Sequence, residues 1–511
     1  MAQGLNTIAK AVGSRLRETR RRPLADYYIL IIVIGLLTVI GVTLVASSSM
    51  TWSISAGGSA WTTALRQTIM VILGLGAGWL ALRVPPGAVR RMALPFLVVS
   101  VALLILVLTP LGTGYEQVGS QSWLVLGPLS FQPSEVARIA IAIWGASFLA
   151  NGEPGTKEFN RRMYWFLGVS LAMCGLIAME HDTGMAVTFL IVVFAVSVFA
   201  GLDGRMVWGT VIAAFGAIVM VSVGGGYRSD RIAVYFDALF GRFDDTSGKA
   251  YQSYQGFLSL ADGSLTGLGL GQSRAKWFYL PEAKNDFIFA VVGEELGFVG
   301  AAVIVGLFAT LGVVGFRTAK RCSNMYLSLL AGALTASVVV QAFVNMAYVV
   351  GLVPVTGIQL PLISAGGTSA IITLTAMGLL LSCARHEPEA ISAMRSYGRP
   401  TLDRLVGLPE PSLEGISASK SVRAKAASSA SGSRQEARRR PAPSREAGRT
   451  RPQRVTPERV NPRRSQARPG AESAQDTASG NRSRRSEGGA GSLNNRSRGQ
   501  RPAPHRDRRR R

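Results

Sequence analysis

The sequence predicts an all-α polytopic membrane protein with about ten transmembrane helices, a large extracytoplasmic loop between helices 7 and 8, and a disordered basic C-terminal tail. Three observations predict this class. Hydrophobic residues make up 48% of the 511 residues, whereas charged residues make up only 17%. The apolar residues form long runs, and a run of about 20 such residues crosses roughly 30 Å of hydrocarbon as a helix. Most of the net charge of +25 follows the last apolar run.

The expected spans are apolar runs separated by polar loops. They cover residues 27–46, 67–82, 92–110, 135–150, 163–179, 184–200, 206–223, 286–315, 326–350 and 366–385. Loops on one side carry basic pairs such as Arg90–Arg91 and Arg161–Arg162, whereas loops 111–134 and 351–365 on the other side contain no Lys or Arg. Basic loops face the cytoplasm, and an even number of spans places both termini there.

Three regions follow from this pattern. Residues 1–26 form a basic cytoplasmic segment, residues 27–385 the transmembrane domain with the external loop 224–285, and residues 386–511 an Arg-rich cytoplasmic tail. The tail almost lacks aromatic residues and cannot bury enough apolar surface to fold, so we expect disorder. Its charge suits anionic membrane lipids or an acidic division protein, with an unbound tail as the default; we expect no nucleic acid.

Cysteine and histidine usage limits the chemistry. The three cysteines, Cys174, Cys322 and Cys383, lie in or beside apolar runs, and an odd number without close spacing argues against a disulfide framework or a zinc site. The chain has three histidines and no HExxH motif, which argues against hydrolysis at a histidine-bound metal. No tightly bound cofactor is implied, and a divalent cation is left open.

Carboxylates near the eighth span are the first candidate functional residues. Asp286 lies at its outer end, and Glu294 and Glu295 lie about two turns deeper. Carboxylates inside a span are costly unless they are paired or hydrated, so they indicate function. The alternatives are that Asp286 caps the helix and that the two glutamates hold neighbouring helices together. The spacing of Gly293 and Gly297 indicates close helix packing.

Polar residues at other outer helix ends are further candidates. Helix breakers precede the last span, and N–H groups near Ser364, Gly366 and Gly367 are suited to hold a phosphate, unless the segment is a plain re-entrant turn. Glu135 stands in the first turn of a helix that begins at Pro133 or Ser134. Asp182 caps a helix or lines the site. Trp123 binds substrate or anchors the chain at the interface.

Basic residues of the external loop are candidates to bind a pyrophosphate, which needs two or more converging cations or backbone donors. The residues selected are Arg228, Arg231, Lys276 and Lys284. Most cations of this loop are expected to be solvated or to contact lipid headgroups.

Several of these motifs, over roughly residues 25–390, resemble the SEDS family (shape, elongation, division, sporulation), which shares the ten-span layout. The matching stretches are Gln132–Glu135, Tyr227–Arg228, Arg231–Ile232, Tyr254–Gln255, Gly267–Gly271, Leu280–Ala283, Asp286–Ala290, Gly293–Gly297, Leu360–Ser364 and Gly366–Gly367. The family commonly has His-Thr at Lys284–Asn285, Tyr at Ala365, and Gln-Pro-Asp-Leu-Gly at Glu180–Gly184. These departures concern neighbours of the family's essential aspartate, which falls on Asp286.

The resemblance implies a peptidoglycan glycosyltransferase that polymerises lipid II into β-1,4-linked glycan strands, releases undecaprenyl diphosphate and works with a class B penicillin-binding protein. It also implies a location in the bacterial cytoplasmic membrane. The stretch 276–283 and the basic tail look more like the division branch, FtsW, which acts at the septum, than the elongation branch, RodA. Asp286 would be the general base for the acceptor hydroxyl. The alternatives are a lipid II flippase and a non-catalytic scaffold that recruits division proteins through its tail.

Overall fold

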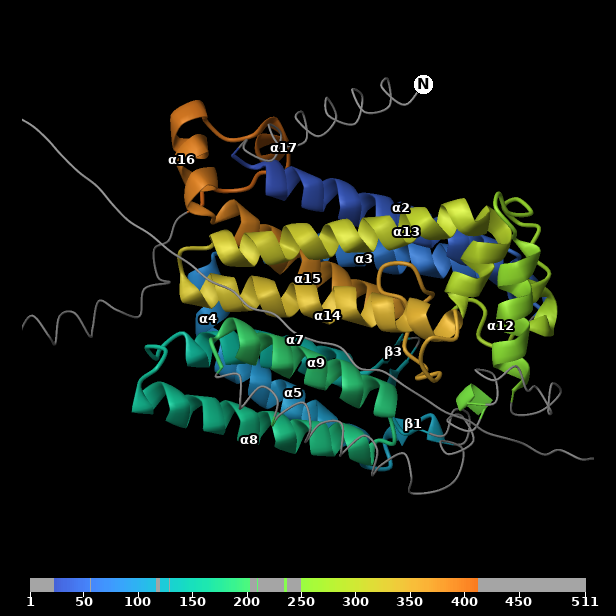
Figure 1. Cartoon of the computed structure of the whole chain (residues 1–511), viewed down its shortest axis with the longest axis horizontal. Coiled ribbons are helices and arrows are strands. Elements are labelled where there is room, and N and C mark those ends of the chain that lie inside the picture. Colours follow the sequence, from blue (N-terminus) through green and yellow to red (C-terminus); the bar gives the residue numbers. More distant parts are fainter. Residues whose placement is uncertain are drawn as a thin grey trace, which may run out of the picture. The chain divides into compact units, whose positions relative to one another are not determined.

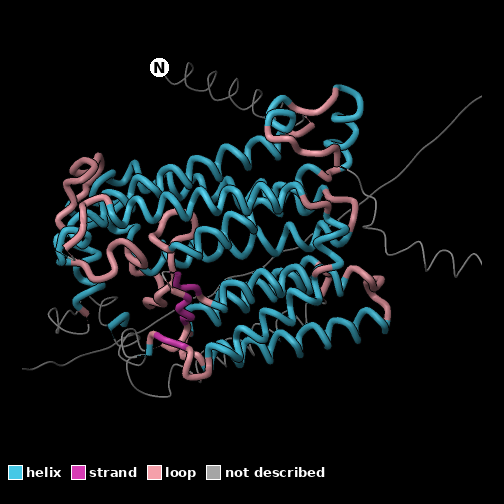
Figure 2. The backbone as a smooth tube through the Cα atoms, turned by 180° about the vertical axis from the view of Figure 1, so that it is seen from behind, coloured by secondary structure: helices cyan, strands magenta, loops and turns pink. Residues whose placement is uncertain are grey.

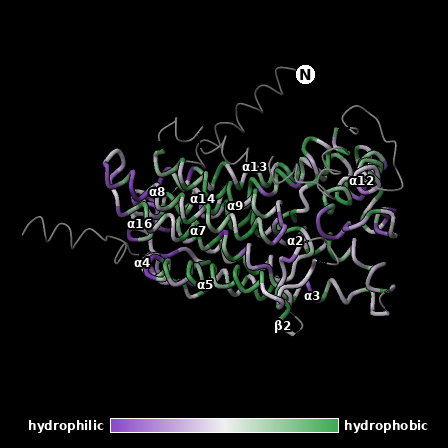
Figure 3. Tube along the Cα trace, turned by 90° about the horizontal axis from the view of Figure 1, so that it is seen from below, coloured by the Kyte–Doolittle hydropathy of each residue, from purple (hydrophilic) through white to green (hydrophobic). Residues whose placement is uncertain are grey.

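The computed structural model describes residues 23–55, 57–115, 120–127, 129–202, 209, 234–236 and 250–411. These residues all belong to one compact unit, Met1–Arg438. Their long helices run side by side, so that the helix ends and loops gather at two opposite ends of a bundle (Figure 1). Hydrophobic residues follow the helices, whereas hydrophilic residues gather toward the two ends, around α4 and α16 and on the side of α12 (Figure 3).

Nine of the expected spans coincide with helices of the described residues. These are α2 (Ala25–Ser55), α3 (Thr62–Arg83), α5 (Ala93–Val107), α7 (Pro133–Leu149), α8 (Lys157–Met179), α9 (Thr183–Phe199), α13 (Ile288–Arg321), α14 (Met325–Val349) and α15 (Gly367–Arg385). The expected span 206–223 lies outside the described residues. Within the described part of the chain, six helices are long and apolar enough to cross a membrane, namely α2, α3, α8, α13, α14 and α15. The all-α polytopic class is therefore confirmed, and the total of ten spans stays a prediction.

Short elements connect the long helices. The short helices are α4 (Pro86–Arg91), α12 (Tyr251–Asp262), the π-helix η1 (Ala275–Tyr279), α16 (Pro388–Tyr397) and α17 (Thr401–Leu405). The strands are β1 (Gly112–Thr113), β2 (Trp123–Leu126) and β3 (Leu129–Phe131), which form an antiparallel sheet in the order β1-β2-β3. Figure 2 shows these strands together at one end of the bundle. Trp123 is paired with Thr113, and Val125 with Ser130.

Small residues allow α3 and α15 to pack backbone against backbone. A Cβ atom at Gly378 would lie 2.1 Å from the carbonyl oxygen of Gly78, and one at Gly78 would lie 2.7 Å from the carbonyl oxygen of Leu374. Neither site has room for a side chain. In a membrane, helices associate through such close contacts because burying apolar surface from lipid gains little.

The segment before α15 enters the bundle to membrane depth. A Cβ atom at Gly41 would lie 2.2 Å from the carbonyl oxygen of Leu362, so the two backbones are in contact. Gly41 is 16 residues into α2, which is about 24 Å along the helix axis from its first residue. Leu360 and Ile363 of this segment are buried. The expected irregular segment is therefore re-entrant and enclosed by protein.

α13 is broken at Gly297, which has φ 68° and ψ −169°. Glycine adopts such a backbone conformation without the steric cost of a Cβ atom. A Cβ atom at Gly297 would also lie 2.3 Å from the nitrogen of Gly267. The prediction that Gly297 serves helix packing is therefore incomplete, because its main effect is to separate the outer part of α13 from the part that continues to Arg321.

The folded part of the chain extends beyond residue 385, which corrects the expected start of a disordered tail at residue 386. α16 and α17 lie against the end of the bundle where α2 begins and α15 ends (Figure 1). Arg385 donates two hydrogen bonds to Asp403, at 2.9 and 2.7 Å, and Tyr27 donates one at 2.8 Å. This buried cluster offsets the low apolar content of the segment. Residues 412–511 lie outside the described residues.

Gly378→Ala is expected to destabilise the protein by about 1–3 kcal/mol, because the new methyl group must displace the backbone of α3. Thermal unfolding of the purified protein in detergent measures the effect. Gly76→Ala is the matched control, since nothing lies within 4 Å of its added Cβ atom. Equal melting temperatures for the two variants would contradict the close packing of α3 on α15.

Asp403→Ala is expected to destabilise the protein by about 3–5 kcal/mol, since it leaves the Arg385 guanidinium buried without its carboxylate. The same unfolding measurement applies. Glu389→Ala is the control, because this carboxylate pairs with Arg321 at 3.1 Å while its side chain is 60% exposed. Exposed pairs contribute about 0–1 kcal/mol. A loss for Asp403→Ala no larger than that of the control would show that α16 and α17 are not anchored through Asp403.

Candidate functional site

Asp286 lies immediately before α13, at the end of the bundle that also holds the strands and the segment 351–366. The N-cap residue of α13 is Phe287, which makes no side-chain cap hydrogen bond, and Asp286 lies one position before it. The alternative that Asp286 caps α13 stays a prediction. The carbonyl oxygens of Lys284, Asn285 and Asp286 all accept hydrogen bonds from other parts of the chain. We call these three residues and their donors the carbonyl clamp.

The donors of the carbonyl clamp come from α14 and from the re-entrant segment. Asn345 Nδ2 and Tyr348 Oη each donate to the carbonyl of Asp286 at 2.8 Å. Ser364 Oγ donates to the carbonyl of Asn285 at 2.6 Å. The Ala365 amide donates to the carbonyl of Lys284 at 2.9 Å. These contacts fix the backbone from which the Asp286 side chain projects.

Two left-handed turns frame the carbonyl clamp. Glu282 has φ 54° and Leu362 has φ 66°, in a region of backbone conformation that non-glycine residues rarely adopt. The carbonyl of Glu282 accepts hydrogen bonds from the amides of Asn285 and Phe287, at 3.0 and 3.2 Å. Asn285 Nδ2 also donates to Glu282 Oε2 at 2.5 Å. The turn before Asp286 is therefore tightly held, as expected of a backbone that positions a side chain.

A second polar cluster lies buried between α7 and α14. Arg138 donates to the Gln341 side-chain oxygen, and Gln341 Nε2 donates to the carbonyl of Gln359 at 2.9 Å. Glu135 stands one turn before Arg138 and interacts with it electrostatically and with Ser369 at the start of α15. Glu135 and Arg138 are 4% and 2% exposed. Within the described residues, Glu135 Oε2 and Arg138 Nε have no hydrogen-bond partner.

Asp182 is the N-cap of α9, which confirms one of the two predicted roles. Its Oδ1 accepts from the Met185 amide at 2.9 Å, and its Oδ2 accepts from Gln132 Nε2 at 2.7 Å. Gln132 is in turn the N-cap residue of α7, where Pro133 occupies the first helical position. Asp182 thus connects the starts of two helices. Trp123 lies in β2, half-buried and paired with Thr113, at the same end of the bundle.

The start of α15 borders the carbonyl clamp. Gly366 is its N-cap and Gly367 its first residue. A Cβ atom at Gly366 would lie 2.3 Å from Gln359 Oε1, so the re-entrant segment closes tightly there. Ser364 uses its hydroxyl within the clamp and accepts from the Leu360 amide at 2.8 Å. Ser364 therefore fixes the backbone of Asn285. The first amides of α15 are suited to bind an anion.

The predicted cations are in different situations. Lys284 Nζ lies over the Trp52 ring, 5.4 Å from its centroid, and the residue is partly exposed. Lys276 is 4% exposed, and its Nζ contacts the Gly271 carbonyl and lies 3.8 Å from Glu295 Oε1. Lys284 is therefore partly accessible, whereas Lys276 is occupied within the protein. Arg228 and Arg231 lie outside the described residues.

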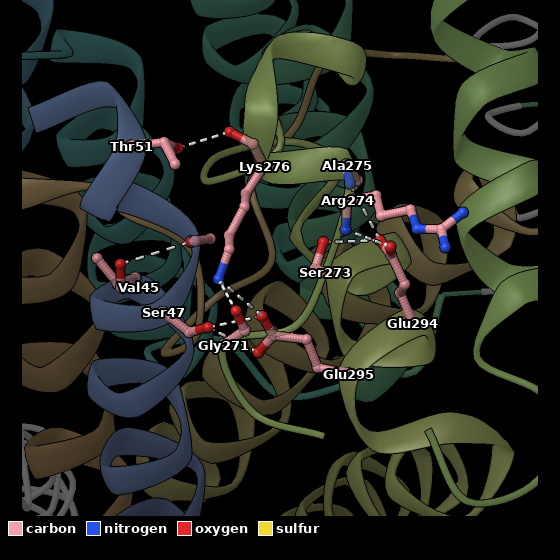
Figure 4. Close-up of polar contacts among 11 residues, drawn as sticks. Val45, Ser47, Thr51, Gly271, Ser273, Arg274, Ala275, Lys276, Glu294 and Glu295 are labelled. Carbon is pink, nitrogen blue, oxygen red and sulfur yellow. Dashed lines mark hydrogen bonds and ion pairs between the residues drawn. The ribbon is translucent and has the colours of Figure 1, made fainter. Parts of the chain in front are cut away.

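Glu294 and Glu295 point in different directions from α13, as Figure 4 shows. Glu294 accepts hydrogen bonds from Ser273 Oγ at 2.7 Å and from the Arg274 amide at 2.5 Å. Glu295 accepts from Ser47 Oγ of α2, at 2.6 and 2.7 Å. Each glutamate is 1% exposed, and its carboxylate accepts hydrogen bonds from neighbouring segments. The contact between Glu295 and Ser47 confirms the alternative that these carboxylates hold neighbouring elements together.

The described residues of the site offer polar and charged side chains for catalysis and binding. Among the described residues, no group of three or more His, Cys, Asp or Glu side chains is placed to hold a metal ion. A divalent cation therefore stays an open expectation. The site offers a carboxylate before the start of α13, a lysine two residues away, and a buried arginine and glutamate on α7.

Sequence reasoning missed Arg138, Gln341, Asn345 and Tyr348. Arg138 carried a usable signal, because it is a charged residue in an apolar run, one turn after Glu135. The three α14 residues lie on one face of a long apolar helix, at spacings of four and three. Such spacing is common, so only the three-dimensional contacts with the Asp286 carbonyl and with Arg138 distinguish them.

The broken helix, the re-entrant segment and the polar site at one end define the chain as a polytopic membrane protein with a polar site at one end of its helices. The family model described as cell cycle protein, which joins FtsW, RodA and SpoVE, matches residues 27–389. The chain belongs to this family.

Individual relatives agree with this assignment. The chain is 39% identical over 390 residues to the probable peptidoglycan glycosyltransferase FtsW of Mycobacterium tuberculosis, which covers 76% of this chain and 74% of the relative. It is 34% identical over 378 residues to stage V sporulation protein E of Bacillus subtilis, covering 72% and 99%. A solved chain from a peptidoglycan synthase complex, described as coordinating polymerization and crosslinking, has a TM-score of 0.55 and 26% identity and covers 70% and 97%.

Glu180 generates a pH prediction. This residue follows α8, is fully buried, and neither carboxylate oxygen has a hydrogen-bond partner within the described residues. Burial, together with the charge of Asp182, raises the pKa of Glu180 from 4.5 to about 9. The folded protein therefore holds a proton that the unfolded chain releases in this range, and wild-type stability falls as pH rises from 4.5 to about 9.

Glu180→Gln is expected to remove that loss, so its melting temperature relative to wild type should rise with pH across the same window. Thermal unfolding in detergent over a pH series measures it. Glu153→Gln is the control at an exposed position and should show no trend. A difference between Glu180→Gln and wild type that is independent of pH would contradict the raised pKa.

Proposed function

We propose that this protein is a peptidoglycan glycosyltransferase that polymerises lipid II into glycan strands outside the cytoplasmic membrane. The relatives named as probable peptidoglycan glycosyltransferases FtsW support this reaction, at 39% identity over 76% of the chain. The polar site at one end of the bundle suits it as well. A lipid-linked sugar keeps its isoprenoid tail in the bilayer while its diphosphate and sugars lie at the outer mouth, where Asp286 stands.

Asp286 acts as the general base in this proposal. The donor sugar is α-linked to the diphosphate and the product is β-linked, so a single inversion suffices. The acceptor 4-hydroxyl attacks the anomeric carbon of the donor, its proton passes to Asp286, and the bond to undecaprenyl diphosphate breaks. The carbonyl clamp is the observation that supports this assignment. It holds the backbone of Lys284–Asp286 through three consecutive carbonyls, and a fixed backbone determines where the Asp286 carboxylate projects.

The leaving diphosphate needs cations or backbone donors. Lys284 is two residues from Asp286 and partly exposed, and the first amides of α15 follow Ala365, which contacts the Lys284 carbonyl. These groups, with Arg228 and Arg231 of the external loop, stabilise the charge that develops on the diphosphate. Trp123, Glu135 and Asp182 lie behind this region and shape the pocket for the sugars.

The cellular setting follows from the same relatives. The FtsW names support a septal role in cell division, with RodA-type elongation as the alternative. The solved relative from a complex of polymerization and crosslinking supports a class B penicillin-binding protein as the partner. The protein then lies in the bacterial cytoplasmic membrane with both termini in the cytoplasm, and the basic tail meets lipids or other division proteins.

A lipid II flippase is the second candidate function. One observation favours it: Glu135 and Arg138 are buried in a transmembrane helix, and within the described residues each has an atom without a hydrogen-bond partner. The bundle also contains a broken helix, and Gln341 connects Arg138 to the re-entrant segment. Transporters use broken helices of this kind at their binding sites. The two functions differ in product, since a flippase moves lipid II without joining it.

Asp286→Asn is expected to lower the rate of glycan polymerisation by about 10²–10⁴-fold, the contribution of a positioned general base. The assay supplies labelled lipid II to the purified full-length protein with its penicillin-binding partner and resolves the glycan strands. Asp262→Asn, at an exposed position in the external loop, is the control and should retain the wild-type rate.

Polymerisation at the wild-type rate by Asp286→Asn would refute the base assignment. Translocation of lipid II across a vesicle membrane by the wild-type protein, with no polymer under any condition, would replace the proposal with the flippase.

A further inference from the structure

We propose that Glu294, Glu295, Lys276 and Ser47 form a buried glutamate brace that positions the end of the external loop before Asp286, so that Lys276 serves the reaction by position and does not bind the diphosphate. This inference rests on the proposed polymerase function. It gives a role in the reaction to two glutamates that the sequence offered either as functional carboxylates or as contacts between helices, and it reassigns a lysine that the sequence offered as a cation for substrate.

The loop fills the break in α13. At Gly297 the helix loses its own hydrogen bonds, and residues 264–269 replace them. The Leu268 and Gly269 amides donate to the carbonyls of Glu294 and Glu295 at 2.9 and 3.0 Å. In return, the Phe298 and Val299 amides donate to the carbonyls of Ser264 and Leu265, at 2.9 and 3.2 Å. The loop is therefore paired to both sides of the break.

Glu294 holds the next part of the loop. Its carboxylate accepts from Ser273 Oγ, from the Arg274 amide and, at 3.4 Å, from the Ala275 amide. These donors lie at the start of η1, where the first amides of a helix lack acceptors within the helix. The Arg274 side chain points away from this contact (Figure 4). Glu294 thus caps η1 from a different helix.

Glu295 and Lys276 join this loop to α2. Ser47 donates to both oxygens of Glu295, and Thr51, one turn later on α2, donates to the Lys276 carbonyl at 2.6 Å. Lys276 Nζ lies between Glu295 and the Gly271 carbonyl (Figure 4). Three segments far apart in the sequence therefore meet at one buried ion pair.

The position of the brace explains its consequence for the site. The chain runs only ten residues from Lys276 to Asp286, and eight from Asp286 to Glu294. The brace holds both ends of this short stretch, while the carbonyl clamp holds its middle. Because the Lys276 side chain is 5% exposed and the Glu295 side chain 0%, a diphosphate would have to displace Glu295 to reach the ammonium. Lys284 is partly exposed and forms no ion pair with a carboxylate among the described residues.

A double-mutant cycle separates position from binding. The variants are Lys276→Met, Glu295→Met and the double variant, in the full-length protein with its penicillin-binding partner. Each single variant leaves one buried charge without its partner, whereas the double variant replaces the pair with side chains of similar length. Lys284→Met removes a partly exposed cation that is a candidate diphosphate ligand, for comparison. Lys320→Met, at an exposed position far along α13, is the control that should change neither readout.

Two readouts are taken. Lipid II polymerisation gives kcat and KM, and hydrogen exchange of residues 264–276 without substrate reports the brace itself. Each single variant is expected to lower kcat by about a hundredfold at nearly unchanged KM, the loss produced by an ångström-scale misplacement. Exchange in 264–276 is expected to accelerate in each single variant. The double variant is expected to recover both values, and Lys284→Met to raise KM.

The proposal is overturned if Lys276→Met raises KM at unchanged kcat, as a substrate ligand would, or if the double variant is no better than the single ones in exchange. Hydrogen exchange needs no activity, so it decides on the brace even if the wild-type protein does not polymerise lipid II. A single variant that fails to fold, while the double variant folds, supports the pairing, and failure of all three with Lys320→Met folded overturns it.

Discussion

The need to satisfy every backbone polar group away from water governs this structure. α13 is broken at Gly297 and the segment 351–366 is irregular at membrane depth, and each arrangement frees amides and carbonyls that lipid cannot solvate. In the structure, other segments of the chain supply hydrogen-bond partners for these amides and carbonyls. Residues 264–269 complete the broken helix, and the segment before α15 bonds to the chain before Asp286. The irregular regions are thus stable only as a set.

This mutual dependence has a functional meaning. A regular helix bundle has no place for a polar substrate, because all its backbone groups are used within each helix. The segment 351–366 folds inward and bonds to the backbone of Lys284 and Asn285, directly before Asp286. The carbonyl clamp and the glutamate brace then restrict the motion of Lys284–Asp286. The hydrogen bonds that satisfy the backbone groups of the irregular segments therefore also position the candidate base.

Buried charged residues form ion pairs near both ends of the bundle. At the end where the chain begins, Asp26 pairs with Arg317 and Arg321 at the end of α13, and Arg385 pairs with Asp403. At the other end, Glu295 pairs with Lys276. Between them, Glu135 and Arg138 keep atoms without hydrogen-bond partners in the described structure. The ion pairs at the two ends join separate elements of the bundle.

The sequence alone determined the helical membrane class, the bounds of most spans to within several residues, and the place of Asp286 at the start of a helix. These depend on hydropathy and local spacing, which act over a few helical turns. Only the tertiary structure decided that Lys276 is buried against Glu295, that Arg138 bonds to Gln341, and that α16 and α17 fold through Asp403. Each joins residues far apart in sequence or on different helices, and local pattern carries no information on such pairs.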